Sequence, residues 1–168
     1  VAVGSQSLQL NTTGSSNVAM GLQALEANTT ASNNTAVGTN ALLVNTTGTE
    51  NTAVGAFAVD ANTTGSRLTG IGSAALSSAT TATDCTAVGR FALANNQTGS
   101  FNAGIGSRAL EDTTTGALNT AVGHIALGDN TTGSSNTGVG YAANGSCITG
   151  GNNTAVGRSA LLANTASD

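Results

Sequence analysis

Hydrophobic and polar positions recur along this chain with a strict 17-residue period. The consensus coil reads N-T-A-V-G-x-x-A-L-x-x-N-T-T-G-S-x, and its first glycine recurs without insertion or deletion. These glycines are Gly4, Gly21, Gly38, Gly55, Gly72, Gly89, Gly106, Gly123, Gly140 and Gly157. Repeats built from helix pairs need roughly 33 to 47 residues, and dense Gly, Thr and Val disfavour helix. The pattern therefore predicts an all-β fold, a parallel β-solenoid (β-roll) of ten 17-residue coils.

Within each coil, the pattern predicts one strand at Thr-Ala-Val, as in Thr52 to Val54. Gly55 then turns the corner, because a residue without Cβ adopts positive φ most easily. A second short strand or a bend holds Ala41-Leu42, and Asn45 to Gly48 forms the return turn. Equivalent residues of neighbouring coils should stack about 4.8 Å apart.

Two apolar columns supply the predicted core of the rod. The first column contains Val3, Met20, Val37, Val54, Ile71, Val88, Ile105, Val122, Val139 and Val156. The second contains Leu8, Leu25, Leu42, Val59, Leu76, Leu93, Leu110, Leu127 and Leu161, and Asn144 interrupts it. A recurring Asn, as in Asn34 and Asn51, adds a polar column whose amides are expected to hydrogen-bond from coil to coil.

The residue before each column valine is always Ala or Gly, so both faces of the predicted strand are apolar. A strand that is apolar on both sides is usually buried on both sides. We therefore expect an outward column that contacts other copies of the chain in a homotrimer or a filament, made by Ala36, Ala53, Ala87, Ala121 and Ala155. The alternative is that these alanines pack at a tight corner of the same core.

Composition narrows the possible functions of the chain. Charged residues make up 7% of the 168 residues and the net charge is -4. The chain lacks the basic stripe that is typical of nucleic-acid binding. No apolar run approaches the roughly 18 residues that span a bilayer. We expect residues 1–168 to form a single repeat domain, as a segment of a longer extracellular, cell-surface or virion fibre protein.

The sequence offers no group of residues suited to catalysis, metal binding or cofactor binding. His124 is the single histidine, and the acidic residues do not recur at one coil position, as a calcium-binding β-roll would require. We therefore expect a non-enzymatic protein without cofactors. Positions that vary between coils are weak candidates for contacts with a host receptor or glycan, namely Arg90, Phe91, Arg108, His124 and Tyr141.

Three further features leave alternatives open. Cys85 and Cys147 lie more than three coils apart, too far along a regular rod for one disulfide, so they are buried thiols or pair between chains. The deviant coil at 136–152 is a local bulge or a specificity patch. The N-x-S/T sequons mark glycosylation sites or simply good turn residues, at Asn11, Asn28, Asn33, Asn45, Asn62, Asn96, Asn130, Asn144 and Asn152.

The coil N-T-A-V-G-x-x-A-L resembles the head repeats of trimeric autotransporter adhesins (YadA-like), whose shorter repeat is close to N-S-V-A-I-G-x-x-S. The full coil, N-T-A-V-G-x-x-A-L-x-x-N-T-T-G, resembles more closely the arrays of phage tail-fibre and related surface proteins. This resemblance implies an extended, trimeric β-roll shaft or head on a cell or virion surface.

Ice binding is the alternative function, because low charge and regular Thr ladders on a solenoid also resemble ice-binding proteins. One ladder contains Thr12, Thr29, Thr46, Thr63, Thr80, Thr114, Thr131 and Thr165. The next contains Thr13, Thr30, Thr47, Thr64, Thr81, Thr98, Thr115, Thr132 and Thr149. Adjacent strand residues face opposite ways, which argues against a flat Thr array at this place.

Overall fold

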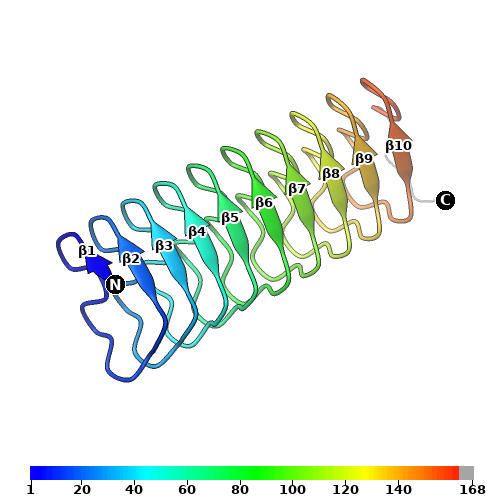
Figure 1. The fold of residues 1–168 in the computed structure, drawn as a ribbon. Coiled ribbons are helices and arrows are strands. Elements are labelled where there is room, and N and C mark those ends of the chain that lie inside the picture. Colours follow the sequence, from blue (N-terminus) through cyan, green and yellow to red (C-terminus); the bar gives the residue numbers. More distant parts are fainter. Residues whose placement is uncertain (163–168) are drawn as a thin grey trace.

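The computed structural model describes residues 1–162 and shows a parallel β-solenoid (Figure 1). Thr165 of the first Thr ladder lies outside these residues. The strands are β1 (Ala2–Val3), β2 (Val18–Met20), β3 (Thr35–Val37), β4 (Thr52–Val54), β5 (Thr69–Ile71), β6 (Thr86–Val88), β7 (Ala103–Ile105), β8 (Thr120–Val122), β9 (Thr137–Val139) and β10 (Thr154–Val156). They form one ten-stranded sheet in chain order, which confirms the predicted fold class.

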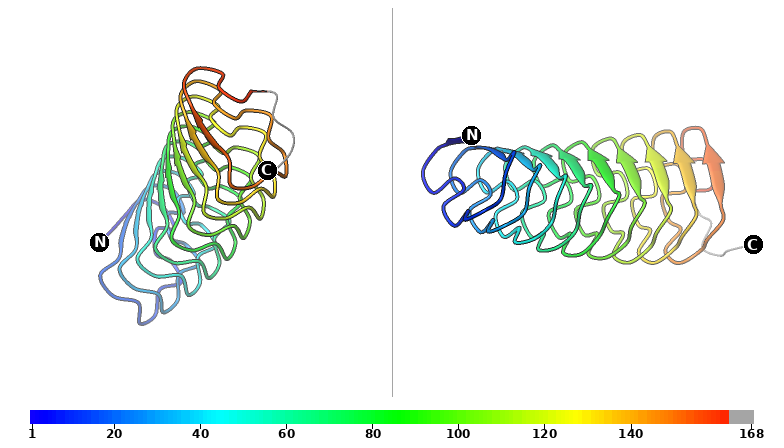
Figure 2. Two further views of the ribbon diagram at one scale, coloured as in Figure 1. Left: turned by 90° about the vertical axis from the view of Figure 1, so that its right-hand side faces the viewer. Right: turned by 60° about the horizontal axis from the view of Figure 1, so that its bottom comes forward.

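The register of the sheet follows the sequence period without slippage. Ala36 pairs with Ala53 and Val37 with Val54, and each later strand continues the same offset of one coil. The coils stack into a rod whose sheet occupies one side and whose turns occupy the others (Figure 2). Because every coil has the same length, the same chemical group recurs at the same place along the whole rod.

The strand alanines point into the coil, and the column valines point outward. Ala36, Ala53, Ala87 and Ala121 are 0% exposed and Ala155 is 2% exposed. The prediction that this column forms an outward interface is therefore wrong, and the alternative of alanine packing inside the core is confirmed. The inside of the coil leaves little room at this column: a Cβ at Gly70, one of its members, would lie 2.5 Å from the Cγ2 atom of Val59.

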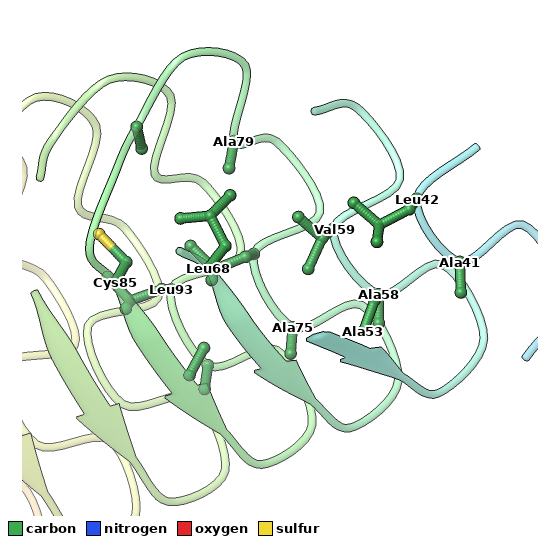
Figure 3. Packing of buried hydrophobic residues seen from close by; sticks show 14 of the residues in the cluster. Ala41, Leu42, Ala53, Ala58, Val59, Leu68, Ala75, Ala79, Cys85 and Leu93 are labelled. Atoms are coloured by element: carbon green, nitrogen blue, oxygen red, sulfur yellow. The ribbon is translucent and has the colours of Figure 1, made fainter. Parts of the chain in front are cut away.

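The Ala-Leu pair of the inner coils forms a turn in which both side chains are buried. Ala41 and Leu42 are both 0% exposed, and Leu42 has a left-handed φ of 52°. That conformation turns the two successive side chains to the same side, whereas in a strand they would face opposite ways. Figure 3 shows Ala53, Ala58 and Val59 packed within the coils. The leucine column is therefore the main apolar filling of the rod.

The recurring corner glycines are required by the stacking as well as by the turn. Gly89 has φ of +134°, and a Cβ there would lie 2.6 Å from the carbonyl of Gly106 in the next coil. Side chains are strained in that conformation, and the neighbouring backbone leaves no room for one. The constant glycine thus keeps adjacent coils in hydrogen-bonding contact.

Two Asn columns bind the coils together. In the first, the Asn34 side-chain oxygen accepts the backbone N–H of Asn51 at 2.9 Å, and its amide nitrogen donates to the Gly48 carbonyl at 2.8 Å. In the second, at the return turn, Asn62 donates to the side-chain oxygen of Asn45 at 2.7 Å. The predicted amide-to-amide ladder therefore lies in the turn column, whereas the first column bonds to backbone.

Candidate functional site

The most extensive surface feature is the outward side of the sheet, which we call the Thr–Val face. Each strand from β3 to β10 contributes its first and third residues to it, except that Ala103 replaces Thr in β7. Large apolar side chains are exposed along this face, including Val54 at 36%, Ile71 at 40% and Val122 at 38%. The prediction that the valine column lies in the core is thus wrong, because these side chains are half-exposed on the outer side of the sheet.

The Thr–Val face also presents free hydroxyl groups. Within the described residues, the hydroxyls of Thr52, Thr69 and Thr120 on this face donate no hydrogen bond to the chain. By contrast, the first turn ladder is engaged: the Thr46 hydroxyl donates to the Thr63 carbonyl at 3.0 Å, and the other described members of that ladder repeat the bond. The second turn ladder, as at Thr47 and Thr64, is exposed, and its hydroxyls donate no hydrogen bond within the described residues. The sheet is therefore distinguished by free hydroxyls that stand beside exposed apolar side chains.

A second candidate site follows the corner glycines, where the next position is held by Arg90, Ser107, His124, Tyr141 and Arg158 in successive coils. We call this row the corner column. The rings of His124 and Tyr141 stack with centroids 5.6 Å apart and an interplanar angle of 9°. The Arg158 guanidinium lies 5.6 Å from the Tyr141 ring centroid, and that of Arg90 lies 4.4 Å from the Phe91 ring.

The four arginines differ in their partners. Arg67 forms a bidentate pair with Asp84, at 2.6 and 2.8 Å, and Arg108 pairs with Glu111. The Arg67 hydrogen bond lowers the pKa of Asp84 below its ordinary value. Within residues 1–162, Arg90 and Arg158 form no ion pair. Among the residues that the structure describes, the corner column therefore carries two guanidinium groups without a carboxylate partner.

An acidic groove lies beside Arg108. It has a volume of about 210 Å³, and its lining includes Glu111, Asp112, Asp129 and the backbone of Gly128 and Gly145. The Asn95 amide donates to Asp112 at 3.0 Å. No cluster of three or more His, Cys, Asp or Glu residues within the described chain is arranged to hold a metal ion.

The sequence candidates Arg90, Phe91, Arg108, His124 and Tyr141 are thus split between neighbouring rows on one corner. Arg90, His124 and Tyr141 share the corner column, whereas Phe91 and Arg108 occupy the next position, in the left-handed conformation. Sequence reasoning missed Arg158, although it lies one coil after Tyr141 and the period alone would have placed it in this column.

The deviant coil keeps its register, so the interpretation as a bulge is wrong. Strand β9 pairs with both β8 and β10, and the Asn144 N–H donates to the Ala160 carbonyl at 2.8 Å. Asn144 is 0% exposed and therefore contributes nothing to a surface patch, whereas Gly145 and Ser146 line the acidic groove.

Most sequon asparagines are unsuitable for glycosylation because they are structural. Asn28, Asn45, Asn62, Asn96, Asn130 and Asn144 are all 0% exposed. The first five donate their amide nitrogens to a carbonyl at the return turn, as Asn62 does to Gly65 at 2.9 Å. The sequons at Asn33 and Asn152 are exposed.

Both cysteines are free and 0% exposed. Burial raises the pKa of the Cys85 thiol, which holds it in the protonated, unreactive form. Pairing between chains would require local opening of the coil, so the structure favours the interpretation as buried thiols.

Comparison with known proteins gives no match: no family model, curated protein or solved structure resembles the chain significantly. The described residues contain no helix long and apolar enough to cross a membrane. Inference about function therefore rests on the surfaces of the rod.

Proposed function

We propose that the chain is a structural segment of an extracellular or virion surface fibre or adhesin, in which copies associate as a parallel homotrimer through the Thr–Val face. The observation that carries the proposal is the exposed apolar column along the sheet, from Met20 at 44% to Val156 at 69% exposure. Continuous exposed apolar patches are typical of interaction surfaces. Burying each such side chain contributes up to about 1.5–3 kcal/mol.

The periodicity of the face favours a second copy of the same chain as its partner. Valines recur once per coil, about 4.8 Å apart, and an identical column in register has the same period over the full rod length. A partner with a different axial repeat would no longer align with the valines after a few coils. Thr side chains beside the valines add methyl groups to the contact and leave hydroxyls for hydrogen bonding. Closed rotational symmetry then limits growth of the assembly.

The interface is tested by placing carboxylates on it. The double variant Val88→Asp/Val122→Asp is expected to lose the trimer, because each interface would then bury unpaired charges near the symmetry axis. Thr98→Asp/Thr132→Asp adds the same charge to the same coils at exposed turn positions and should keep the trimer. Light scattering gives the masses and circular dichroism confirms the fold. Equal masses for the two variants would contradict the assigned face.

Ice binding is a second candidate function, favoured by the free hydroxyls of the Thr–Val face. A flat sheet that alternates hydroxyl and methyl columns at a fixed spacing offers water a regular template. The two functions make opposite demands, since a trimer covers this face and ice binding needs it exposed. Thermal hysteresis that is present in a monomeric rod and lost in Thr86→Lys would favour ice binding. Its absence in the monomer would rule this function out.

A further inference from the structure

We propose that the corner column between Arg90 and Arg158 binds an acidic polysaccharide that lies along the rod axis. This inference deepens the proposed function of a surface fibre and rests on it. The corner follows the ends of β6 to β10, beyond the arrowheads in Figure 1. It lies past the edge of the Thr–Val face, so association of chains through that face leaves the column accessible.

The first argument is preorganisation. His124, Tyr141 and Arg158 come from three successive coils, and the coil spacing alone brings their flat groups face to face. Tyr141 is 49% exposed although both faces of its ring are occupied. The stack therefore offers outward the phenol hydroxyl, imidazole nitrogens and guanidinium donors. Ordered groups lose little conformational entropy on binding, which favours affinity.

The second argument is charge. The rod is acidic overall, with a net charge of -4, yet the corner column holds two guanidinium groups without an ion-pair partner in the described chain. They lie four coils apart, roughly 19 Å at the coil spacing of parallel strands. Guanidinium forks bind carboxylate and sulfate groups in a bidentate manner. Two such anchors at this separation suit a linear polyanion that follows the axis.

The groups between the anchors favour a sugar chain over other polyanions. Ser107 stands between Arg90 and His124 and is the smallest side chain of the five, and His124 is exposed. Hydroxyl and imidazole groups suit the many hydroxyls of a pyranose chain. Nucleic-acid binding usually needs several phosphate contacts from basic residues, and the chain has four Lys and Arg residues in all.

The test measures binding of polygalacturonate, a carboxylated polysaccharide, by isothermal titration calorimetry, with neutral dextran and poly-L-glutamate as comparison polymers. We expect binding of polygalacturonate only. Tyr141→Ala and Arg158→Ala should each weaken it about tenfold, because each removes one group that hydrogen-bonds to the polyanion. Arg67→Ala removes the same charge from a different corner, where it is already paired, and should leave affinity unchanged.

Three results would overturn this proposal: no binding of polygalacturonate, equal binding of poly-L-glutamate, or equal weakening by Arg67→Ala. The mass of each sample is measured by light scattering beside the titration. A trimer that fails to bind contradicts the polysaccharide site alone, whereas a binding monomer contradicts the assembly alone.

Discussion

At the scale of single residues, the least favourable position in the rod is Asn144. It occupies the leucine column at 0% exposure, and neither its amide nitrogen nor its amide oxygen has a hydrogen-bond partner among residues 1–162. An unsatisfied buried amide is costly, and the coil also lacks the apolar volume that Leu127 supplies one coil earlier. The deviant coil should therefore be the weakest point of the described rod.

Asn144→Leu should raise the stability of the rod by about 2–4 kcal/mol, because it removes the unpaired amide and restores apolar burial. The measurement is the midpoint of thermal unfolding. Asn144→Ala, which removes the amide without filling the space, should gain less. A lower melting temperature for the Leu variant would show that the amide has a partner or a role that the structure does not reveal.

Asp60 is the residue whose ionisation opposes folding. Its carboxyl is half-buried, one of its oxygens has no hydrogen-bond partner in the described part of the chain, and desolvation raises its pKa above the ordinary value. The folded state thus prefers the protonated acid, so its contribution to stability is favourable at low pH and is lost as pH rises through the raised pKa.

Asp60→Asn should accordingly melt at a higher temperature than the parent at pH 7, and the difference should shrink as the pH falls through the raised pKa of Asp60. Asp84→Asn is the matched control with the opposite sign, because the Arg67 hydrogen bond lowers the pKa of Asp84 and favours its ionised form. Melting curves over a pH series give both differences. A constant Asp60→Asn difference at every pH would contradict the desolvation argument.

At the scale of the strand, alternation of side chains sets two faces, and packing decides which one turns inward. The inner residue must fit between the leucine column and the Ala-Leu turn of its own coil: a Cβ at Gly104, also in the inner column, would lie 3.1 Å from the Ala109 carbonyl oxygen and 3.3 Å from Cγ of Leu93. Alanine meets this limit with small shifts, whereas valine would not. The face with larger apolar groups is therefore left outside.

The adjacent pair Ala87→Asp and Val88→Asp tests this orientation. Ala87→Asp buries a carboxylate and should cost about 3–5 kcal/mol or prevent folding. Val88→Asp places the same group on a half-exposed position and should cost about 1 kcal/mol or less in the isolated chain. Melting temperatures are compared at low protein concentration. If Val88→Asp proves the more damaging of the two, the strand is turned the other way.

The strand pair also shows how far sequence alone reaches. The period, the strand positions, the corner glycines and the leucine column followed from repetition, because each recurs at one coil position. Which side of the strand faces inward could not be predicted in this way. Ala53 and Val54 are both apolar, and hydropathy does not tell which of the two side chains fits inside the coil. Likewise, the left-handed φ of Leu42, which buries both members of the Ala-Leu pair, has no signature in residue type.

At the scale of the whole molecule, the rod combines a uniform framework with a few local surfaces. The Thr–Val face repeats along the sheet and suits association with identical copies. The corner column is confined to the C-terminal half of the rod, where the rings of His124 and Tyr141 stack and the Arg158 guanidinium lies over Tyr141. This division accords with a fibre segment in which the framework supports assembly and variable positions supply contacts.

The most direct test of the central claim is the solution mass of the unmodified chain, measured by size exclusion with light scattering over a range of concentrations. The proposed assembly predicts a mass of three chains of 16.1 kDa each, with dissociation on dilution. A mass of one chain at every concentration would contradict the assembly and leave the Thr–Val face open to water, the condition that ice binding requires.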